Sequence, residues 1–549
     1  MRLRTLVGTG AVAAAMLALA TPAGLAGTSG NVRVTRDAEP GSYVRSDGQA
    51  DATTQACSTG KRAQNEPTVA VDPRSPSVVV AGSNDYCAAI VNGDVWVGYY
   101  RSTDGGAHWT NSLVPGYPQD TSAAGVSSPV HGSCGAAGDP TQSFDGSGRL
   151  FYGFICFNRT KPVNGSIFVA TYDQDGARYV RTALVDEGTP SGQFSSGLFQ
   201  DKVNLVVDQT SGPHAGNLYV AWARYAGRAQ NNVILFSRST DHGASFSRPI
   251  RISPGLAEEQ FADLAVGPDG AVYLTYRTFS HQGPTQDAIF VEKSTDGGMS
   301  FSEPQLVATV QPFDSNSFSG NGSESCGDGP LACPSGLTFS RFASLSAVAA
   351  DANGVHVVWS AELPNGQAKV FVRNSPNGTE WPTPAAPLDS APRGHQYFPD
   401  VGSAGGVITV VFYDSRSDPA YSPLVPPGDT SQGRNSGDVV NTFVARSTDG
   451  GKSWVETQVT TAGSNYNWET HGSRRVPFWG DYIYVSAVPG GVYVVWTDSR
   501  NLVPGVDQRD PGATDGFDVF TTCGTKSPPA SDACLSQGGL DQNIYGERI

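Results

Sequence analysis

Carboxylates, arginines and aromatic rings recur at matching places in this 549-residue chain, although only 16% of its residues are charged. The candidates for catalysis are Glu66, Asp139, Asp414, Tyr482 and His395, the last as a base or ligand. The candidates for substrate binding are Arg277, Arg416, Arg475, Arg500, Trp479 and Tyr397. Aromatic rings stack on the C–H faces of sugars, and charged groups bond hydroxyls or carboxylates. The set therefore predicts carbohydrate recognition.

Seven repeated segments carry these residues. Each has a polar lead-in, an apolar strand, a short Gly, Asp or Pro turn and a second apolar strand. They begin at Asn65, Gly138, Gln200, Phe261, Arg341, Tyr397 and Phe478. The repeats predict an all-β, seven-bladed β-propeller over residues 61–523, with six blades as the alternative.

The last repeat reaches a third strand in residues 515–523 but shows no fourth strand. The segment 27–60 contains an early strand from Asn31 that would close the ring, since propellers protect their edges. Residues 524–549 are expected to form a C-terminal tail.

A second pattern, Ser-x-Asp-x-Gly-x-x-aromatic, occurs four times after strand-like runs. Its aspartates are Asp104, Asp241, Asp296 and Asp449. The spacing suits a tight hairpin in which Asp caps backbone N–H groups, Gly takes a positive φ and the aromatic ring folds back onto the blade. We therefore interpret these aspartates as turn formers, not as catalytic groups.

Strand direction places these turns on one face of the propeller, and the long loops lie on the other face. Segments 111–137, 303–340 and 456–475 lead into first strands, while 417–438 and 501–516 follow second strands. Because long loops converge on that face, we expect the functional site there, around the central channel. The pairs Asp414 with Arg416 and Asp498 with Arg500 have a structural alternative as ion pairs between blades or as turn caps.

The first 26 residues combine two arginines with an apolar run and small residues, which predicts a secretory signal peptide. Eight cysteines then favour disulfides, with the neighbouring pairs Cys57–Cys87, Cys134–Cys156, Cys326–Cys333 and Cys523–Cys534. A net charge of −15 argues against nucleic acid as a partner. We expect a secreted monomer without membrane insertion that binds an extracellular glycan. We expect no cofactor, apart from calcium at the oxygen-rich loops containing Asp507, Asp510, Asp515 and Asp518.

The four turns and the blade pattern resemble the Asp-box, or BNR-repeat, propellers of the sialidase (neuraminidase) superfamily over nearly the whole mature chain. The resemblance implies an exo-sialidase-type site with three arginines for the substrate carboxylate, a Tyr–Glu nucleophile and an Asp acid/base. On this template Arg277, Arg416 and Arg500 would form the clamp. Tyr482 would be the nucleophile, and Glu66, Asp139 or Asp414 would be the acid/base. The sequence departs from the family at Asn65-Glu66-Pro67, where an arginine is expected, and in having Arg475-Val476-Pro477 in the last blade.

Three functions fit these observations. The favoured function is a secreted sialidase-type glycoside hydrolase, which requires opposed carboxyl groups or a Tyr–Glu pair at the channel mouth. A non-catalytic propeller that binds a glycan or a protein is the first alternative. A polysaccharide lyase on uronic-acid polymers is the second, with arginines neutralising the uronate and His395 or a tyrosine as base.

Overall fold

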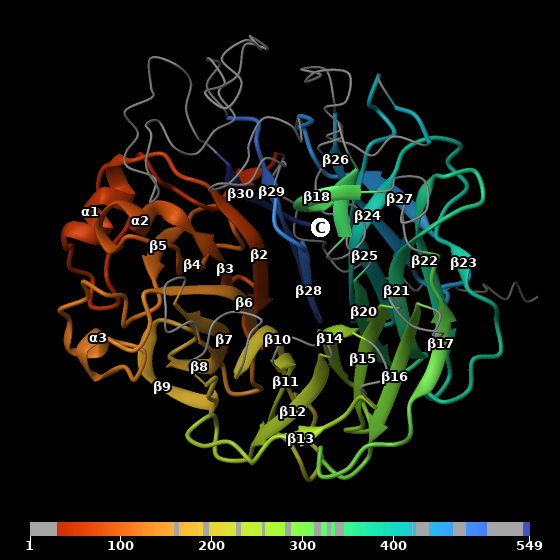
Figure 1. Cartoon of the computed structure of the whole chain (residues 1–549), viewed down its shortest axis with the longest axis horizontal. Coiled ribbons are helices and arrows are strands. Elements are labelled where there is room, and N and C mark those ends of the chain that lie inside the picture. Colours follow the sequence, from red (N-terminus) through yellow and green to blue (C-terminus); the bar gives the residue numbers. More distant parts are fainter. Residues whose placement is uncertain are drawn as a thin grey trace, which may run out of the picture.

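The predicted repeats fold into four-stranded antiparallel units, which we number as blades in chain order (Figure 1). This computed structural model describes residues 30–549 except 159–163, 190–196, 227–231, 255–257, 280–286, 312–319, 327–330, 335–344, 420, 424–438, 465–478 and 502–541. It does not describe the side chains of 90, 320–326 and 331–334. The expected signal peptide lies outside the described residues.

Six blades consist of four consecutive strands each. Blade 1 has β2 (Gln64–Val71), β3 (Val79–Asp85), β4 (Trp96–Ser102) and β5 (Thr110–Leu113). Blade 2 has β6 (Ala136–Phe144), β7 (Leu150–Phe157), β8 (Gly165–Asp173) and β9 (Arg178–Asp186). Blade 3 has β10 (Leu198–Val207), β11 (Leu218–Ala226), β12 (Val233–Ser239) and β13 (Ile250–Arg251).

The next three blades follow the same order. Blade 4 has β14 (Glu258–Val266), β15 (Val272–Phe279), β16 (Ala288–Ser294) and β17 (Gln305–Thr309). Blade 5 has β20 (Ser346–Asp351), β21 (Gly354–Glu362), β22 (Ala368–Ser375) and β23 (Ala386–Pro387). Blade 6 has β24 (Gln396–Ala404), β25 (Val407–Asp414), β26 (Asn441–Ser447) and β27 (Val455–Gln458).

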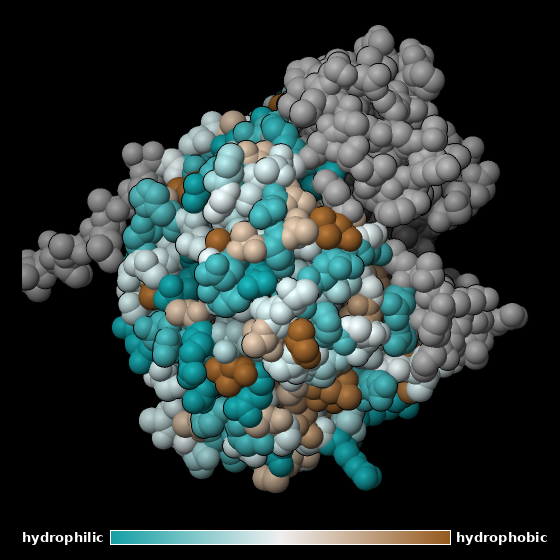
Figure 2. Space-filling view, turned by 90° about the vertical axis from the view of Figure 1, so that its left-hand side faces the viewer, coloured by the Kyte–Doolittle hydropathy of each residue, from teal (hydrophilic) through white to brown (hydrophobic). Residues whose placement is uncertain are grey.

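Smaller elements lie between or beside these strands. They are the hairpin β18 (Gly320–Cys326) and β19 (Leu331–Pro334), the helices α1 (Ala52–Thr59), α2 (Ala89–Asn92) and α3 (Ala123–Ser127), and the 3₁₀ helix η1 (Tyr86–Ala88). No described helix is long and apolar enough to cross a membrane. Figure 2 shows a mostly hydrophilic side of the molecule on which apolar residues form small separate spots.

Blade 7 closes the ring with strands from both ends of the described chain. It contains β28 (Tyr484–Val488), β29 (Gly491–Asp498), β30 (Asn543–Arg548) and β1 (Val32–Arg33). The strand near Asn31 therefore supplies the fourth position, since Val32 pairs with Gly546. The third strand differs from the expectation: it is β30, within the expected tail, and the segment 515–523 lies outside the described residues.

The first strands of the seven blades form a closed circle. Contacts run from β2 to β6, β10, β14, β20, β24 and β28, and β28 contacts β2 again. Blades 2 and 3 also share one parallel strand pair, Phe199 with Gly165. The all-β, seven-bladed prediction is thereby confirmed, and the first strands line the central channel (Figure 1).

The Asp-box turns have the predicted local structure. In blade 3 the backbone N–H groups of Ala244 and Ser245 donate to Asp241 Oδ1 at 3.1 and 2.9 Å. Gly243 has φ +73° and lies against Phe151 of the preceding blade, so a Cβ there would be strained and crowded. These turns therefore join each such blade to its neighbour. The disulfides Cys57–Cys87 and Cys134–Cys156 are present, and the other two predicted pairs lie outside the described side chains.

Candidate functional site

A β-bulge interrupts the first strand of five blades at nearly the same position, close to the channel mouth. Each bulge contains a non-glycine residue with φ between +49° and +57°: Glu66, Asp139, Lys202, Phe261 and Phe398. Left-handed backbone costs such residues about 1 kcal/mol or more, and bulges redirect side chains near functional sites. The same strained position thus recurs in five first strands, at the level where their side chains reach the propeller axis.

Lys202 connects the first strands of three blades with the lead-in of a fourth. Its Nζ lies 2.6 Å from Asp481 Oδ2, 3.2 Å from Asp139 Oδ2 and 3.7 Å from Glu66 Oε1. Burial alone would lower the pKa of Lys202, but the carboxylates of Asp139, Asp481 and Glu66 outweigh it and hold the pKa well above its usual value. Lys202 is therefore a permanent cation that holds this acidic cluster together.

The neighbouring carboxyl groups differ in their affinity for protons. Burial, and to a lesser degree the nearby Asp139, raises the pKa of Asp201 to about 7, and Asp201 hydrogen-bonds to Asp139. Burial likewise raises the pKa of Glu66 well above its usual value, although Asn84 Nδ2 donates to Glu66 Oε2 at 2.7 Å. Asp201 is thus partly protonated near neutral pH, beside a lysine that balances the charge of the cluster.

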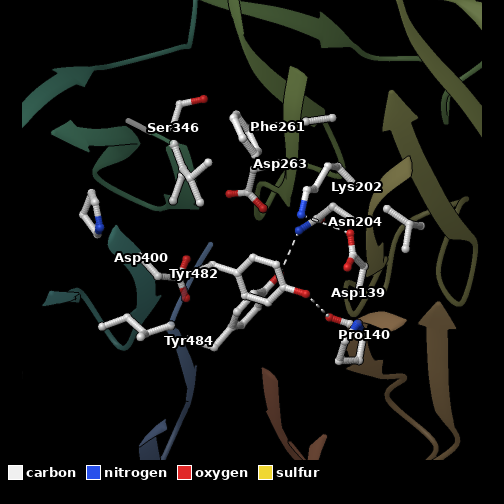
Figure 3. Close-up of a pocket in the computed structure, with 16 residues that line it drawn as sticks. Asp139, Pro140, Lys202, Asn204, Phe261, Asp263, Ser346, Asp400, Tyr482 and Tyr484 are labelled. Atoms are coloured by element: carbon white, nitrogen blue, oxygen red, sulfur yellow. Dashed lines mark hydrogen bonds and ion pairs between the residues drawn. The ribbon is translucent and has the colours of Figure 1, made fainter. Parts of the chain in front are cut away.

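A pocket of about 540 Å³, counting its part open to solvent, lies beside this cluster in the central channel (Figure 3). Its walls include Asp139, Lys202 and Tyr482 near the mouth. The part formed by blades 3 to 7 contributes Asn204, Asp263, Ser346, Asp400 and Tyr484. Blades from around the ring therefore deliver polar side chains to one space.

Of the predicted catalytic residues, Glu66, Asp139 and Tyr482 come together around Lys202. Tyr482 Oη donates to the Pro140 carbonyl at 3.4 Å. Burial and the carboxylates of Glu66 and Asp139 raise the pKa of Tyr482 well above its usual value. The phenol consequently keeps its proton, which is unfavourable for the nucleophile role expected from the sequence.

The three arginines of the predicted anion clamp are ion-paired to nearby carboxylates of the protein, and none of them lines the pocket. Arg277 Nη2 lies 2.6 Å from Asp287 Oδ2, and Arg500 Nη2 lies 2.6 Å from Asp498 Oδ2. Arg416 pairs with Asp414 at 2.6 Å and also with Asp389 and Glu456 at 2.9 Å. These contacts favour the interpretation of Asp414 and Arg416 as a structural ion pair over a role in substrate binding.

Three other candidates are buried inside blades. His395 is 0% exposed: its Nδ1 accepts from the Ala368 N–H at 3.1 Å, and its Nε2 lies 2.9 Å from the Ser422 carbonyl. Tyr397 and Trp479 are 0% and 1% exposed, and both pack against Tyr413. These residues support the blades and do not form a surface on which sugars could stack. Arg475 lies outside the described residues.

The Asp-box aspartates Asp104, Asp241, Asp296 and Asp449 occupy the opposite face and cap their own turns, as predicted. Among the described residues, no group of three or more His, Cys, Asp or Glu side chains is arranged to hold a metal ion. The loops proposed for calcium, with Asp507, Asp510, Asp515 and Asp518, lie outside them.

Sequence reasoning did not single out the deeper residues Asn204, Ser346, Asp400 and Tyr484. A weak signal exists, since a polar residue stands two positions after the bulge residue in Lys202-Val-Asn204 and Phe398-Pro-Asp400. It becomes informative only when the repeats are aligned on the bulge, and the bulge itself is not visible in the sequence.

Comparison with known proteins finds structural likeness but no sequence relative. No model of a known protein family matches, and no curated protein matches by sequence. Solved structures that resemble the chain include a leech intramolecular trans-sialidase (12% identity, TM-score 0.40, 65% of each chain). They also include a GH93 α-L-arabinofuranosidase of Fusarium graminearum in complex with arabinobiose (12% identity, TM-score 0.42, 70% of this chain and 92% of that one). The match thus spans about two thirds of the leech enzyme, and the similarity is one of fold.

Proposed function

We propose that this protein is a secreted glycoside hydrolase that acts on a neutral sugar unit at the mouth of its central channel. One observation carries the proposal. Asp201, whose pKa is raised to about 7, hydrogen-bonds to Asp139, whose carboxylate lies 3.2 Å from the Lys202 ammonium at a solvent-open pocket. Two carboxyl groups in unequal environments are the recurring machinery of glycoside hydrolysis.

The unequal environments assign the two roles. Asp201 donates its proton to the glycosidic oxygen as the bond from that oxygen to the anomeric carbon breaks. Once ionised, Asp201 accepts a proton from the water that attacks the anomeric carbon, and Asp139, which hydrogen-bonds to Asp201, stabilises the positive charge that develops on the sugar. Lys202 Nζ, 3.2 Å from Asp139 Oδ2, balances the negative charge of this pair.

The charge of the pocket favours a neutral substrate over sialic acid or a uronate. Asp139, Asp263 and Asp400 line it, and Lys202 is the one basic residue among its described lining side chains. An anionic sugar would meet three carboxyl groups there and no arginine clamp, which a planar carboxylate requires. The missing clamp also disfavours a uronate lyase, and His395, proposed with a tyrosine as its alternative bases, is buried.

The experiment is to incubate the purified mature protein with neutral arabinans, galactans and xylans, with sialosides and with uronate polymers, and to weigh the products by mass spectrometry. Hydrolysis adds one water to each cleaved bond, whereas a lyase forms an unsaturated product. Asp139→Asn and Asp201→Asn should each lower hydrolysis at least about 100-fold. Asp269→Asn is the matched control, because Asp269 is an exposed turn residue beyond the opposite end of β14. Cleavage confined to sialosides or polyuronates, or full activity in Asp139→Asn, would overturn the proposal.

A non-catalytic glycan-binding propeller is the second candidate, and the pairing of Lys202 with three carboxylates favours it. Groups that satisfy one another are less available for chemistry. Binding of an oligosaccharide in calorimetry, with no product from any substrate, would support this candidate over the hydrolase.

A further inference from the structure

Tyr482 presents an aromatic ring to the pocket beside the acidic cluster. It lines the pocket and is only half-buried, so part of its side chain is accessible to a ligand. The other aromatic lining residues are engaged in packing. Phe261 is 8% exposed and packs against Phe279 in a T-shaped contact, while Tyr484 packs against Tyr482 itself. Tyr482 is therefore the ring best placed to meet a ligand in this space.

Two contacts hold the Tyr482 ring in one orientation. Its Oη donates to the carbonyl of Pro140, the residue after Asp139, at 3.4 Å. Its ring centroid lies 6.0 Å from that of Tyr484, with an angle of 75° between the ring planes. Tyr484 Oη in turn accepts from Asn204 Nδ2 at 2.8 Å, which fixes the supporting ring. A flat aromatic surface is thus positioned before any ligand binds, which lowers the entropy lost on binding.

Carboxyl groups surround this ring. Figure 3 shows the Tyr482 ring almost face-on, with the side chains of Asp139, Asp263 and Asp400 around it. Backbone N–H groups of the following blade donate to Asp263 Oδ2 and to Asp400 Oδ2, each at 2.7 Å, so both carboxyl groups have fixed orientations. Carboxyl oxygens accept hydrogen bonds from hydroxyls. A sugar that lies flat on the ring points its hydroxyls outward, towards these acceptors.

We propose that Tyr482 is the platform on which a neutral sugar unit of the substrate stacks, and that it positions this sugar beside Asp139. The inference rests on the proposed hydrolase function for its part in catalysis. An aromatic ring binds the C–H face of a sugar, while polar groups around it bind the hydroxyls. The ring edge that carries Oη reaches Pro140, so a sugar stacked on it lies next to Asp139. This role requires the ring of Tyr482, whereas a nucleophile requires its hydroxyl.

The test separates the ring from the hydroxyl. Calorimetry measures the affinity for neutral oligosaccharides of arabinan, galactan and xylan in the Asp201→Asn background, in which hydrolysis should be slow. The conservative variant Tyr482→Phe should retain affinity within about threefold, whereas Tyr482→Leu, which has no flat ring, should bind about tenfold more weakly. Tyr179→Leu is the matched control and should bind like the parent. Tyr179 is also half-buried, but it lies on β9 at the outer side of blade 2 and does not line the pocket.

Hydrolysis is measured with the same substitutions in the wild-type background. Tyr482→Phe should keep most of the rate, and Tyr482→Leu should lower kcat/KM about tenfold, mainly through KM. Loss of hydrolysis in Tyr482→Phe with binding retained would overturn the proposal in favour of a nucleophile. Unchanged affinity in Tyr482→Leu, or no binding of any of these oligosaccharides by the parent, would also overturn it. If Tyr482→Leu does not fold, Tyr482→Met provides the same comparison with a more adaptable apolar side chain.

The two readouts also separate this proposal from the proposed function. If wild type forms no product but Tyr482→Leu still weakens binding, the platform is supported and the hydrolase is not. If wild type hydrolyses a neutral glycan with an affinity that does not depend on Tyr482, the platform alone is refuted.

Discussion

Replacing Lys202 with methionine should destabilise the protein strongly at neutral pH and only weakly at acidic pH. Lys202 lies 2.6, 3.2 and 3.7 Å from three carboxylates whose residues are almost completely buried or, for Asp139, 12% exposed at the side chain. At an effective dielectric constant near 20, each contact represents roughly 4 to 6 kcal/mol of gross attraction. Most of that offsets the desolvation of the charges, but removal of one partner leaves the others uncompensated. We therefore expect Lys202→Met to lose about 3–5 kcal/mol in the free energy of unfolding at pH 7.5.

The pH dependence separates this explanation from a simple packing defect. Burial and the neighbouring Asp139 and Asp481 already raise the pKa of Glu66, and Lys202 opposes them; without the cation the pKa of Glu66 rises further above its unfolded value. A carboxyl group whose pKa is higher in the folded state than in the unfolded state lowers the free energy of unfolding as the pH rises. Its effect is small at a pH where it is protonated in both states. Urea unfolding should therefore show the gap between variant and wild type narrowing from pH 7.5 to pH 5. Lys202→Arg is the control that keeps the charge. A loss below about 1 kcal/mol, or a loss independent of pH, would refute the reasoning.

Three further predictions follow from single contacts. Asp241→Ala should lower the free energy of unfolding by about 1–2 kcal/mol in urea, since it removes two hydrogen bonds to backbone N–H groups. Partial burial acts to raise the pKa of Asp241, but hydrogen bonding outweighs it and lowers the pKa to about 2. The difference between variant and wild type should therefore shrink as the pH falls from about 4 towards 2. Arg416→Ala should lower the free energy of unfolding by about 2 kcal/mol in the same assay, because it breaks three ion pairs. It should leave glycan affinity within threefold of wild type. Weaker binding without loss of stability would support the predicted anion clamp instead. Hydrolysis should decline as the pH rises through about 7, where Asp201 loses its proton, and a rate that stays constant up to pH 9 would contradict its role as the acid.

Much of the fold could be predicted because its signals are local. The hairpin of first and second strands alternates apolar and polar residues between turn residues, and the Asp-box turn is encoded within eight residues. The third strand of blade 7 was missed because β30 is a short polar stretch whose partner, β1, precedes it by about 500 residues. Pairing at that distance leaves no pattern in the sequence.

The site was predicted in part, and the bulges explain the errors. Glu66, Asp139 and Tyr482 do lie near the axis, as expected from the places where first strands begin. Tyr397, however, stands directly before the bulge residue Phe398, and a one-residue bulge changes which side chains of a strand face the channel. The sequence alternation alone therefore assigns Tyr397 to the wrong environment.

Closure of the ring by β1 and β30 has a consequence for how the protein is made. Val32 pairs with Gly546 in the outer half of blade 7, so this blade is complete only when segments from both ends of the described chain have met. Six blades can assemble from consecutive segments, but the seventh has to wait for the end of the chain to emerge. Contacts between such distant segments slow folding, because a very long loop must close before they stabilise the chain. Until then the edge of β29 that β30 covers is exposed, and this is the stage at which the protein is most vulnerable to aggregation.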